Sequence, residues 1–555
     1  MKIYISKTLG INTYDGFHLV QDNIVTGYHN PWNDYDYFVT FWLYHVSNGE
    51  KTKIDSSKLL INGEMKTTDF LLEKGVSVTD KISDITSIIE ELEAVSLGES
   101  INYYQKINFI LAEDREQINN LLYLLHDASY QYDNEAVYSQ YTGYEQTIKR
   151  DGETAKSLIR KGYHVALGTY QKDKSFKLCL DSPLPTIDPI EFKFDISKEI
   201  AKTNINLIIG ENGSGKTHIL KRISEVMLGI TKNSSDWPFF HKLVITSYSP
   251  FENFYTKEEI LNLLDKKNDK NNSSKRDKER RNIHINKYAY IGFKDKKNKF
   301  NLNWPKESSV NSIEAIIAYD QEENWWNEYS RLDNLKDTLS LSMDFDEIAV
   351  KIKDDDFYII DSKSYKTFNK IKNEIKRNEG LFFLKNGLPI KLSSGQEIFS
   401  YMIPSLAAEI EDESLIVIDE PELYLHPTLE VALINMLKNL LDETNSSAII
   451  ATHSALIARE VADDGVLILK KKDGYTTVQP PEIQTFGESL EVIIGEAFDD
   501  YTTYKPFQLE IDQLIEDGQN VQDLLKDISS EVGDEALVYI SSPGTKKHIG
   551  IKEKQ

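Results

Sequence analysis

A glycine-rich loop, Gly210 to Thr217, carries the residue types that hold phosphate groups. It reads GENGSGKT, follows the apolar run Ile205–Ile209, and precedes a segment with apolar residues at helical spacing. Strand, glycine loop and helix in this order is the context in which G-x-x-x-x-G-K-[ST] indicates a P-loop. Gly213 and Gly215 let backbone N–H groups approach phosphate oxygens, and the N-terminus of the following helix attracts the same anion.

The remaining side chains of the loop complete the predicted nucleotide site. Lys216 can reach the β- and γ-phosphates, and Thr217 can supply a hydroxyl to Mg²⁺. We therefore expect ATP and Mg²⁺ as cofactors. The residues expected to contact the nucleotide here are Gly210, Glu211, Asn212, Gly213, Ser214, Gly215, Lys216, Thr217 and His218.

Two carboxylates follow a second apolar strand. Leu415–Ile418 leads directly into Asp419 and Glu420. Because unpaired buried charge is costly, acids at the end of a buried strand usually face a metal or a substrate. A third apolar run, Ala448–Ala451, leads into Thr452 and His453.

Composition limits the class of protein. A chain of 555 residues suggests three or four domains, and 40% hydrophobic residues suffice for real cores. No apolar run has the length of a membrane span or a signal peptide, so we expect no membrane contact and a cytoplasmic location. Cys179 is the only cysteine, which excludes a disulfide framework and a cysteine-based zinc site. The net charge of −25 argues against nucleic-acid binding over the whole surface.

One local stretch is basic. Residues 266–299 hold thirteen Lys or Arg against four acids. Charge runs of this kind are usually solvated loops, which is the interpretation we favour. The alternative is a contact with a nucleic-acid backbone.

Changes in composition and hydrophobic pattern along the chain predict five regions. Residues 1–160 read as a separate α+β domain for sensing, docking or dimerisation, with a helix over Ser83–Ala94. Residues 161–300 read as a β-rich lead-in, with paired strands at Tyr163–Tyr170 and Ser175–Leu180, followed by the P-loop lobe. Residues 301–380 read as a mostly helical insertion or lid. Residues 381–480 hold the carboxylates and His453, and 481–555 form an acidic helical tail.

A second motif follows a predicted Asn-Gly hairpin at Asn386 and Gly387. Leu392-Ser393-Ser394-Gly395-Gln396 resembles the LSGGQ signature of ABC-type ATPases and departs from it only at Ser394. The resemblance implies an α/β fold, an ABC-ATPase P-loop head. It also implies nucleotide contacts from Ser393, Ser394, Gly395 and Gln396.

The same resemblance implies roles for the acids and the histidine. Leu415–Glu420 looks like a Walker B strand, in which Asp419 anchors Mg²⁺ and Glu420 polarises the attacking water. His453 matches the switch histidine that contacts the γ-phosphate, so the implied catalytic residues are Glu420, His453 and Lys216. Since the signature of one ABC head faces the P-loop of another, a homodimer or higher homo-oligomer enclosing two ATP is implied.

Three further sequence segments resemble one branch of that superfamily. Asp419–Pro427, which reads DEPELYLHP, resembles the soluble SMC/RecF/OLD branch. Ser249–Phe254 and Glu482–Gly487 look like bacterial AAA-type anti-phage defence ATPases, among them the Septu ATPase PtuA and the PARIS ATPase AriA. This similarity implies a separate effector chain, such as a nuclease or toxin. The chain departs from that group in the 160 residues that precede the ATPase, and its tail is too short for the Toprim nuclease of OLD proteins.

Some alternatives stay open. A DNA-repair or chromosome-maintenance ATPase would bind DNA directly, and a scaffold would retain only vestigial turnover. Phe357–Lys363 superficially resembles the Asp-x-Lys strand of a nuclease, but we favour a surface hairpin. ABC proteins usually carry a Gln after the strand that follows the P-loop helix. Ser247–Phe254 has none, so either Ser249 or Glu252 replaces it or hydrolysis is slow.

Overall fold

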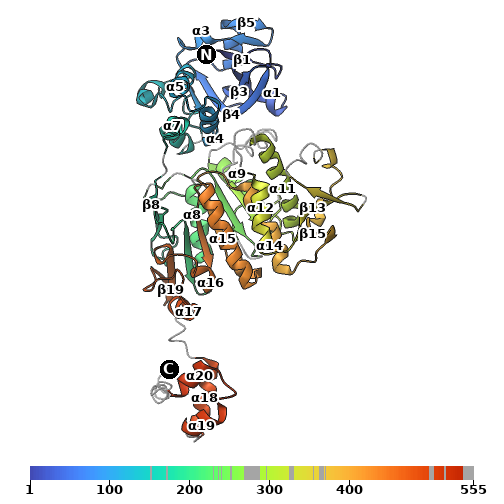
Figure 1. Ribbon diagram of the computed structural model, residues 1–555. Coiled ribbons are helices and arrows are strands. Elements are labelled where there is room, and N and C mark those ends of the chain that lie inside the picture. Colours follow the sequence, from blue (N-terminus) through green and yellow to red (C-terminus); the bar gives the residue numbers. More distant parts are fainter. Residues whose placement is uncertain are drawn as a thin grey trace.

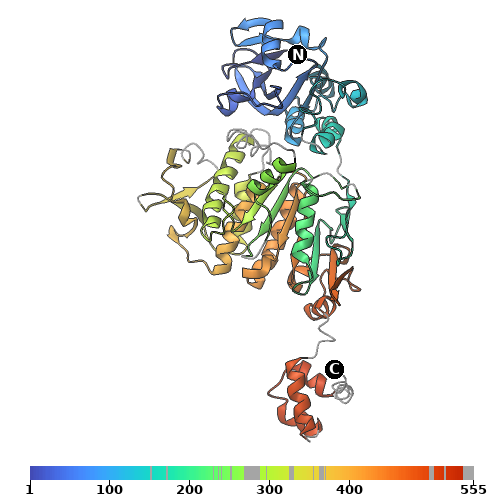
Figure 2. The same ribbon diagram turned by 180° about the vertical axis from the view of Figure 1, so that it is seen from behind.

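Three bodies follow one another along the chain: an N-terminal unit, a central unit built on a parallel sheet, and a C-terminal cluster of helices (Figures 1 and 2). The computed structural model describes most of residues 1–555. The residues outside the description are 151–152, 171–172, 229, 236, 239, 250–252, 268–287, 296, 324–329, 354, 362–367, 369, 499–504, 518–520 and 542–555.

The N-terminal unit is a seven-stranded mixed sheet with helices packed against it. The strand order is β5-β6-β1-β2-β3-β4-β7, in which β1 and β2 are parallel. The strands are β1 (Ile3–Ser6), β2 (Gly16–Gln21), β3 (Thr40–Ser47), β4 (Glu50–Ile61), β5 (Val76–Thr79), β6 (Ile82–Asp84) and β7 (Ala94–Gly98). The helices are α1 (Asp22–Thr26), α2 (Thr67–Lys74), α3 (Thr86–Ile89), α4 (Ile101–Ile110), α5 (Arg115–Leu124), η1 (Tyr132–Asn134), α6 (Glu135–Tyr138) and α7 (Glu153–Ala166).

Two predictions in this unit are wrong. The predicted helix over Ser83–Ala94 is mostly strand and turn, and only α3 is helical. There Asp84 Oδ1 accepts from the backbone N–H of Thr86 at 3.0 Å, which turns the chain out of β6. The predicted strand at Tyr163–Tyr170 begins inside α7, whose buried face carries Leu158, Ile159 and Val165 at helical spacing.

The central sheet has the strand order β12-β11-β17-β18-β10-β19-β20. All neighbours are parallel except β19 and β20. The strands are β10 (Ile205–Gly210), β11 (Leu243–Ser247), β12 (Tyr288–Gly292), β17 (Leu415–Asp419), β18 (Ser447–Thr452), β19 (Val466–Lys472) and β20 (Tyr475–Gln479). The mixed α/β fold class is therefore confirmed.

Both faces of this sheet are covered, as parallel sheets require. One face packs on α8 (Lys216–Met227) and on the hairpin of β8 (Ser175–Leu180) and β9 (Ile190–Asp195). The other face packs on α11 (Trp304–Glu323), α14 (Ser394–Glu409) and α15 (Pro427–Glu443). Since side chains alternate along a strand, Ile208 lies in the first core and Leu207 and Ile209 in the second.

The described residues of the insertion, 301–380, are mostly helical, as predicted, and they also hold two strands. The helices α11 and α12 (Arg331–Ser340) are followed by β13 (Glu347–Lys351), β14 (Phe357–Ile360) and η2 (Arg377–Glu379). Together with β15 (Leu381–Lys385) and β16 (Leu388–Pro389), these strands form a four-stranded sheet in the order β14-β13-β15-β16. Ile348, Ala349 and Val350 are all fully buried, and β13 lies between β14 and β15, with which it pairs antiparallel.

The Asn-Gly hairpin is confirmed. β15 (Leu381–Lys385) pairs antiparallel with β16 (Leu388–Pro389). Asn386 and Gly387 both have positive φ, 51° and 75°, as the tight turn requires. The chain then enters α14.

The C-terminal region is helical, as predicted. After η3 (Pro421–Tyr424), α16 (Ala455–Ala458) and η4 (Asp463–Gly465) of the central unit come α17 (Leu490–Phe498), α18 (Pro506–Glu516), α19 (Val521–Ile528) and α20 (Asp534–Ser541). The last three share a small core of their own. No helix among the described residues is long and apolar enough to cross a membrane.

Candidate active site

The predicted reactive residues lie at one edge of the central sheet because their strands are parallel neighbours. β18 lies between β10 and β17, and it pairs parallel with both. The carboxyl end of β10 leads into the P-loop, that of β18 into His453, and that of β17 into Asp419 and Glu420. Ligands of open α/β sheets bind outside this edge.

The P-loop has the backbone that its sequence predicts. Gly213 and Gly215 have φ of 77° and 103°, which other residues rarely adopt. A Cβ on Gly215 would lie 2.6 Å from Ile187 Cδ1, so the Ile187 side chain would have to shift to admit another residue here. Glu211, Asn212, Gly213 and His218 are exposed, and Ser214 is buried.

Lys216 is folded back over the loop. Its side chain is buried, and Nζ donates to the carbonyl of Gly210 at 3.0 Å. The same Nζ lies 2.6 Å from His453 Nε2. Burial lowers the pKa of this ammonium, against the opposing effect of the Glu420, Asp419 and Glu422 carboxylates. A phosphate group would supply the anionic partner that the buried cation needs.

Thr217 and Asp419 form a pair that suits Mg²⁺. Thr217 Oγ1 donates to Asp419 Oδ2 at 3.0 Å. Asp419 is buried, and its Oδ1 is buried without a hydrogen-bond partner. Burial raises the pKa of this carboxyl to about 7. A hydroxyl beside an unsatisfied carboxylate oxygen fits a hard cation that takes most of its ligands from phosphate and water.

The described residues contain no group of three or more His, Cys, Asp or Glu side chains arranged to hold a metal ion. A metal site here would therefore depend on the nucleotide for further ligands.

Glu420 and His453 face each other. Glu420 Oε1 lies 3.4 Å from His453 Nε2. The hydrogen bond from His453 lowers the pKa of Glu420, which favours the ionised carboxylate. Glu420 has a left-handed backbone, φ 48° and ψ 58°, a conformation that non-glycine residues adopt at a cost and that often marks functional sites.

The signature residues lie at the start of α14. Ser393 is the N-cap, and its side chain and that of Gln396 form a capping box. Ser393 and Ser394 are exposed, whereas Gly395 is buried, and a Cβ there would lie 2.7 Å from the Tyr424 carbonyl oxygen. Gln396 Nε2 donates to the Ser342 carbonyl at 3.1 Å. Among the described residues, no hydrogen bond joins this segment to the P-loop of its own chain.

Three neighbours of the site were missed by sequence reasoning. Glu422 Oε1 accepts from the backbone N–H of His453, and burial raises the pKa of this carboxyl. Lys471 Nζ donates to the Gly213 carbonyl at 3.1 Å. The Phe498 ring lies parallel to the His453 ring, with 6.3 Å between centroids. Only Glu422 had a sequence signal, since it falls within the DEPE motif.

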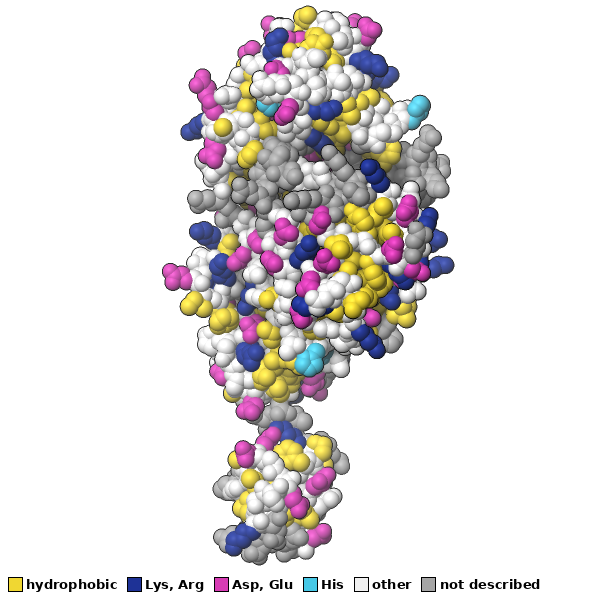
Figure 3. All heavy atoms as spheres, turned by 45° about the vertical axis from the view of Figure 1, so that its right-hand side comes forward, with side chains coloured by type: hydrophobic (Ala, Val, Ile, Leu, Met, Phe, Trp, Pro, Cys, Tyr) yellow, Lys and Arg dark blue, Asp and Glu magenta, His cyan; other side chains and the backbone are white. Residues whose placement is uncertain are grey.

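Several predicted segments lie outside the described residues. Glu252 is one of them, whereas Ser249 is described. Residues 268–287 and 296 of the basic stretch and Lys363 are also outside. On the face that Figure 3 shows, described basic and acidic side chains are interspersed over the two larger bodies.

Comparison with known proteins supports an ATPase domain. Residues 205–459 match the family model described as "AAA domain, putative AbiEii toxin, Type IV TA system". Protein ea59 of Escherichia phage lambda is 26% identical over 539 residues, which is 92% of this chain and 93% of that protein.

Solved structures overlap with the chain only in part. The SMC head domain from Thermotoga maritima has 14% identity and a TM-score of 0.26, and the match covers 56% of this chain and 100% of that one. RNase-L Inhibitor has 13% identity and a TM-score of 0.26, with 56% of this chain covered. The chain spans only 40% of the length of that structure. The family-model match, rather than these overlaps, supports an AAA-type ATPase domain within residues 205–459.

Because the pKa of Asp419 is raised, we expect replacement of its carboxyl group to increase the free energy of unfolding in a pH-dependent way. The folded-state pKa of about 7 exceeds the usual 3.8, so wild-type protein loses stability as pH rises from about 4 to 7. Asp419→Asn removes this loss, so the variant should gain on wild type over that range, by up to roughly 4 kcal/mol. Thermal unfolding without nucleotide or Mg²⁺ measures it.

The matched control is Asp337→Asn, at an exposed position of α12. It should follow wild type at every pH. A difference between Asp419→Asn and wild type that does not change with pH would contradict the buried, proton-binding carboxyl.

Proposed function

We propose that this chain binds and hydrolyses ATP as the ABC-type ATPase subunit of a bacterial anti-phage defence complex. It would dimerise around ATP and control a separate effector chain, a nuclease or another toxin. The observation that carries the ATPase part is the convergence of Lys216, Thr217, Asp419, Glu420 and His453 at one sheet edge.

In this proposal each side chain has a task. Lys216 and the P-loop N–H groups would bind the β- and γ-phosphates, while Thr217 and Asp419 would hold Mg²⁺. The metal would supply charge neutralisation on the phosphate oxygens. Glu420, kept ionised, orients the attacking water and accepts its proton. His453, held at its backbone by Glu422, lies between Lys216 and Glu420, where it can contact the γ-phosphate.

A head-to-tail dimer would complete the site. The exposed Ser393 and Ser394 begin a helix whose N-terminus carries a partial positive charge, which suits a phosphate. Because these residues make no hydrogen bond with their own P-loop in the described structure, a second copy would receive them. ATP would then be held between the two chains.

The defence part of the proposal has two supports. The matching family model is described as an AAA domain and "putative AbiEii toxin, Type IV TA system", and a similar protein is encoded by a phage. The helices α18 to α20 form a small body with its own core, separate from the ATPase in Figure 1, and would provide a docking site for the effector.

The alternative is an ATPase of DNA repair or chromosome maintenance that acts directly on DNA. Its support is the basic composition of residues 266–299. This function requires salt-sensitive DNA binding through that stretch.

Glu420→Gln should abolish most turnover. The substitution keeps the shape of the side chain but removes the base, so kcat should fall by roughly 10²–10⁴-fold. ATP binding should persist because the P-loop is intact. Phosphate release and nucleotide binding measure the two effects, and Glu374→Gln, at an exposed position remote from the site, is the control. Unchanged turnover in Glu420→Gln would exclude Glu420 as the base.

Mixing two inactive variants tests the shared site. Lys216→Ala disables the P-loop, and Ser393→Arg disables the signature. In a mixed head-to-tail dimer, both lesions fall in one site and the other site is intact. Random mixing should therefore restore about one quarter of wild-type ATPase activity. If each variant is inactive alone and the mixture is inactive too, the shared site is wrong.

Co-purification with the product of a neighbouring gene separates defence from repair. The defence proposal predicts that a small nuclease or toxin remains bound to the chain, and that phage protection survives neutralisation of the basic stretch. Retained DNA without any protein partner, lost on that neutralisation, would favour repair.

A further inference from the structure

The N-terminal unit meets the ATPase at a short acidic loop, 410–414, between two catalytic elements. The loop connects the end of α14, which begins with the signature, to the start of β17, which ends at Asp419 and Glu420. A displacement of this loop would therefore move both α14, which carries the signature, and β17, which carries the acids.

Helix α4, helix α7 and Tyr170, which follows α7, contact this loop. Lys161 of α7 forms an ion pair with Glu413 Oε2, and the Tyr170 hydroxyl donates to Glu413 Oε1 at 2.9 Å. Gln105 of α4 donates to Asp412 Oδ2 at 3.2 Å. Both members of the ion pair are buried, Lys161 with 7% and Glu413 with 4% of its surface exposed. Loss of one partner would leave an uncompensated buried charge.

The loop is also tied to the ATPase itself. Glu411 pairs with Lys242 at 2.9 Å and with His241 at 3.2 Å, both at the start of β11. The backbone N–H of His241 donates to the Glu413 carbonyl at 2.9 Å, and that of Glu413 to the Thr444 carbonyl at 2.8 Å. Glu413 itself has a positive φ of 57°. Its backbone is thus held in an uncommon conformation next to the Walker B strand.

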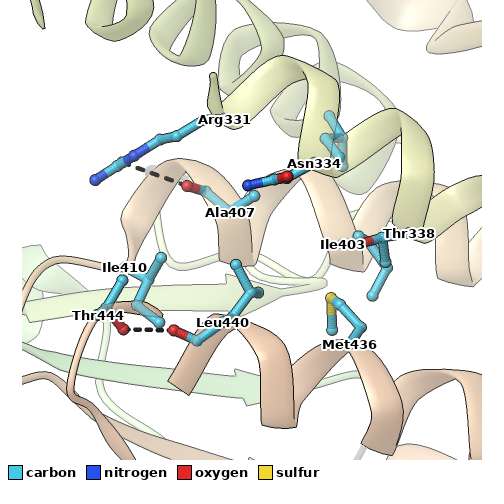
Figure 4. A pocket seen from close by; sticks show the side chains of 10 residues that line it. Arg331, Asn334, Thr338, Ile403, Ala407, Ile410, Met436, Leu440 and Thr444 are labelled. Atoms are coloured by element: carbon cyan, nitrogen blue, oxygen red, sulfur yellow. Dashed lines mark hydrogen bonds between the residues drawn. The ribbon is translucent and has the colours of Figure 1, made fainter. Parts of the chain in front are cut away.

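Apolar packing does not enclose the loop on every side. Ile410 and Thr444 line a cavity of about 20 Å³ between α12, α14 and α15, into which Leu440 and Met436 also point (Figure 4). The polar contacts of Gln105, Lys161 and Tyr170 with the loop lie apart from this cavity's lining.

On the other side, α4 and α7 form a rigid pair. A Cβ on Gly162 of α7 would lie 2.5 Å from the Tyr104 ring of α4, which shows how closely the helices pack. Asn108 of α4 donates to the Ala166 carbonyl at 2.7 Å, and Lys106 to the Ile54 carbonyl of β4 at 3.0 Å. A displacement of the N-terminal sheet would thus reach the loop through these helices.

We propose that Lys161 is a positioning residue for ATP hydrolysis, through which the N-terminal unit sets the Walker B strand by way of Glu413. The proposal rests on the ATPase function proposed above. Glu413 precedes Asp419 by six residues, about 20 Å along an extended chain. Lys161 therefore acts on the geometry of Asp419 and Glu420 and touches neither nucleotide nor metal.

The test compares kcat with KM for Mg²⁺-ATP in the full-length chain. Lys161→Met keeps the apolar stem and removes the charge. We expect kcat to fall about tenfold while KM stays within about twofold, because the P-loop is untouched. The charge swap Lys161→Glu with Glu413→Lys should restore kcat to within about threefold of wild type. The matched control is Lys202→Met, which breaks the exposed Lys202–Asp442 pair just before β10 and should change neither constant.

If the wild type hydrolyses ATP and Lys161→Met has the same kcat, this proposal alone is overturned. The same holds if the charge swap is no more active than the single variants. Absence of turnover in wild type and in Lys202→Met overturns the ATPase function as well. If Lys161→Met does not fold, Tyr170→Phe replaces it, since it removes one hydrogen bond to Glu413 without burying a charge. A fall in its kcat of about threefold at constant KM supports the proposal, and no change overturns it.

Discussion

The parallel pairing of β18 between β10 and β17 is the constraint on which the site depends. Parallel neighbours end at the same edge, so the P-loop, His453 and the two acids of β17 are brought together by backbone hydrogen bonds alone. The register matters too, since Ile209 pairs with Thr452 and Asp419 with Ala451. A shift of one residue would turn Asp419 to the opposite face of the sheet.

The nucleotide site and the contact with the N-terminal unit lie at opposite ends of the strands of this sheet. Reactive side chains lie at the carboxyl ends of the strands, and the contacts with the N-terminal unit lie before their amino ends, at the loop that carries Glu413. β17 joins the two edges directly. Because protein interiors are packed as densely as crystals, a buried strand such as β17 connects the two ends rigidly.

Much of the site was predictable from the sequence because its motifs are short and local. The P-loop, the Walker B strand and the Asn386-Gly387 hairpin are each written in consecutive residues, and the structure places Lys216, Asp419, Glu420 and His453 together. Contacts between distant segments left no local signal. Lys161 and Glu413 are 252 positions apart, and the stacking of Phe498 on His453 brings a C-terminal helix to the site. The helix α7 was partly misjudged as a strand, although Leu158, Ile159 and Val165 lie at helical spacing in its sequence.

The most direct test of the account is phosphate release from Mg²⁺-ATP, measured per chain over protein concentrations that span the monomer-to-dimer transition seen by sedimentation. A site shared between two chains predicts turnover per chain that rises with the dimer fraction and is lost without Mg²⁺. Undiminished turnover per chain where the protein is monomeric, or no phosphate release from the dimer, would contradict it.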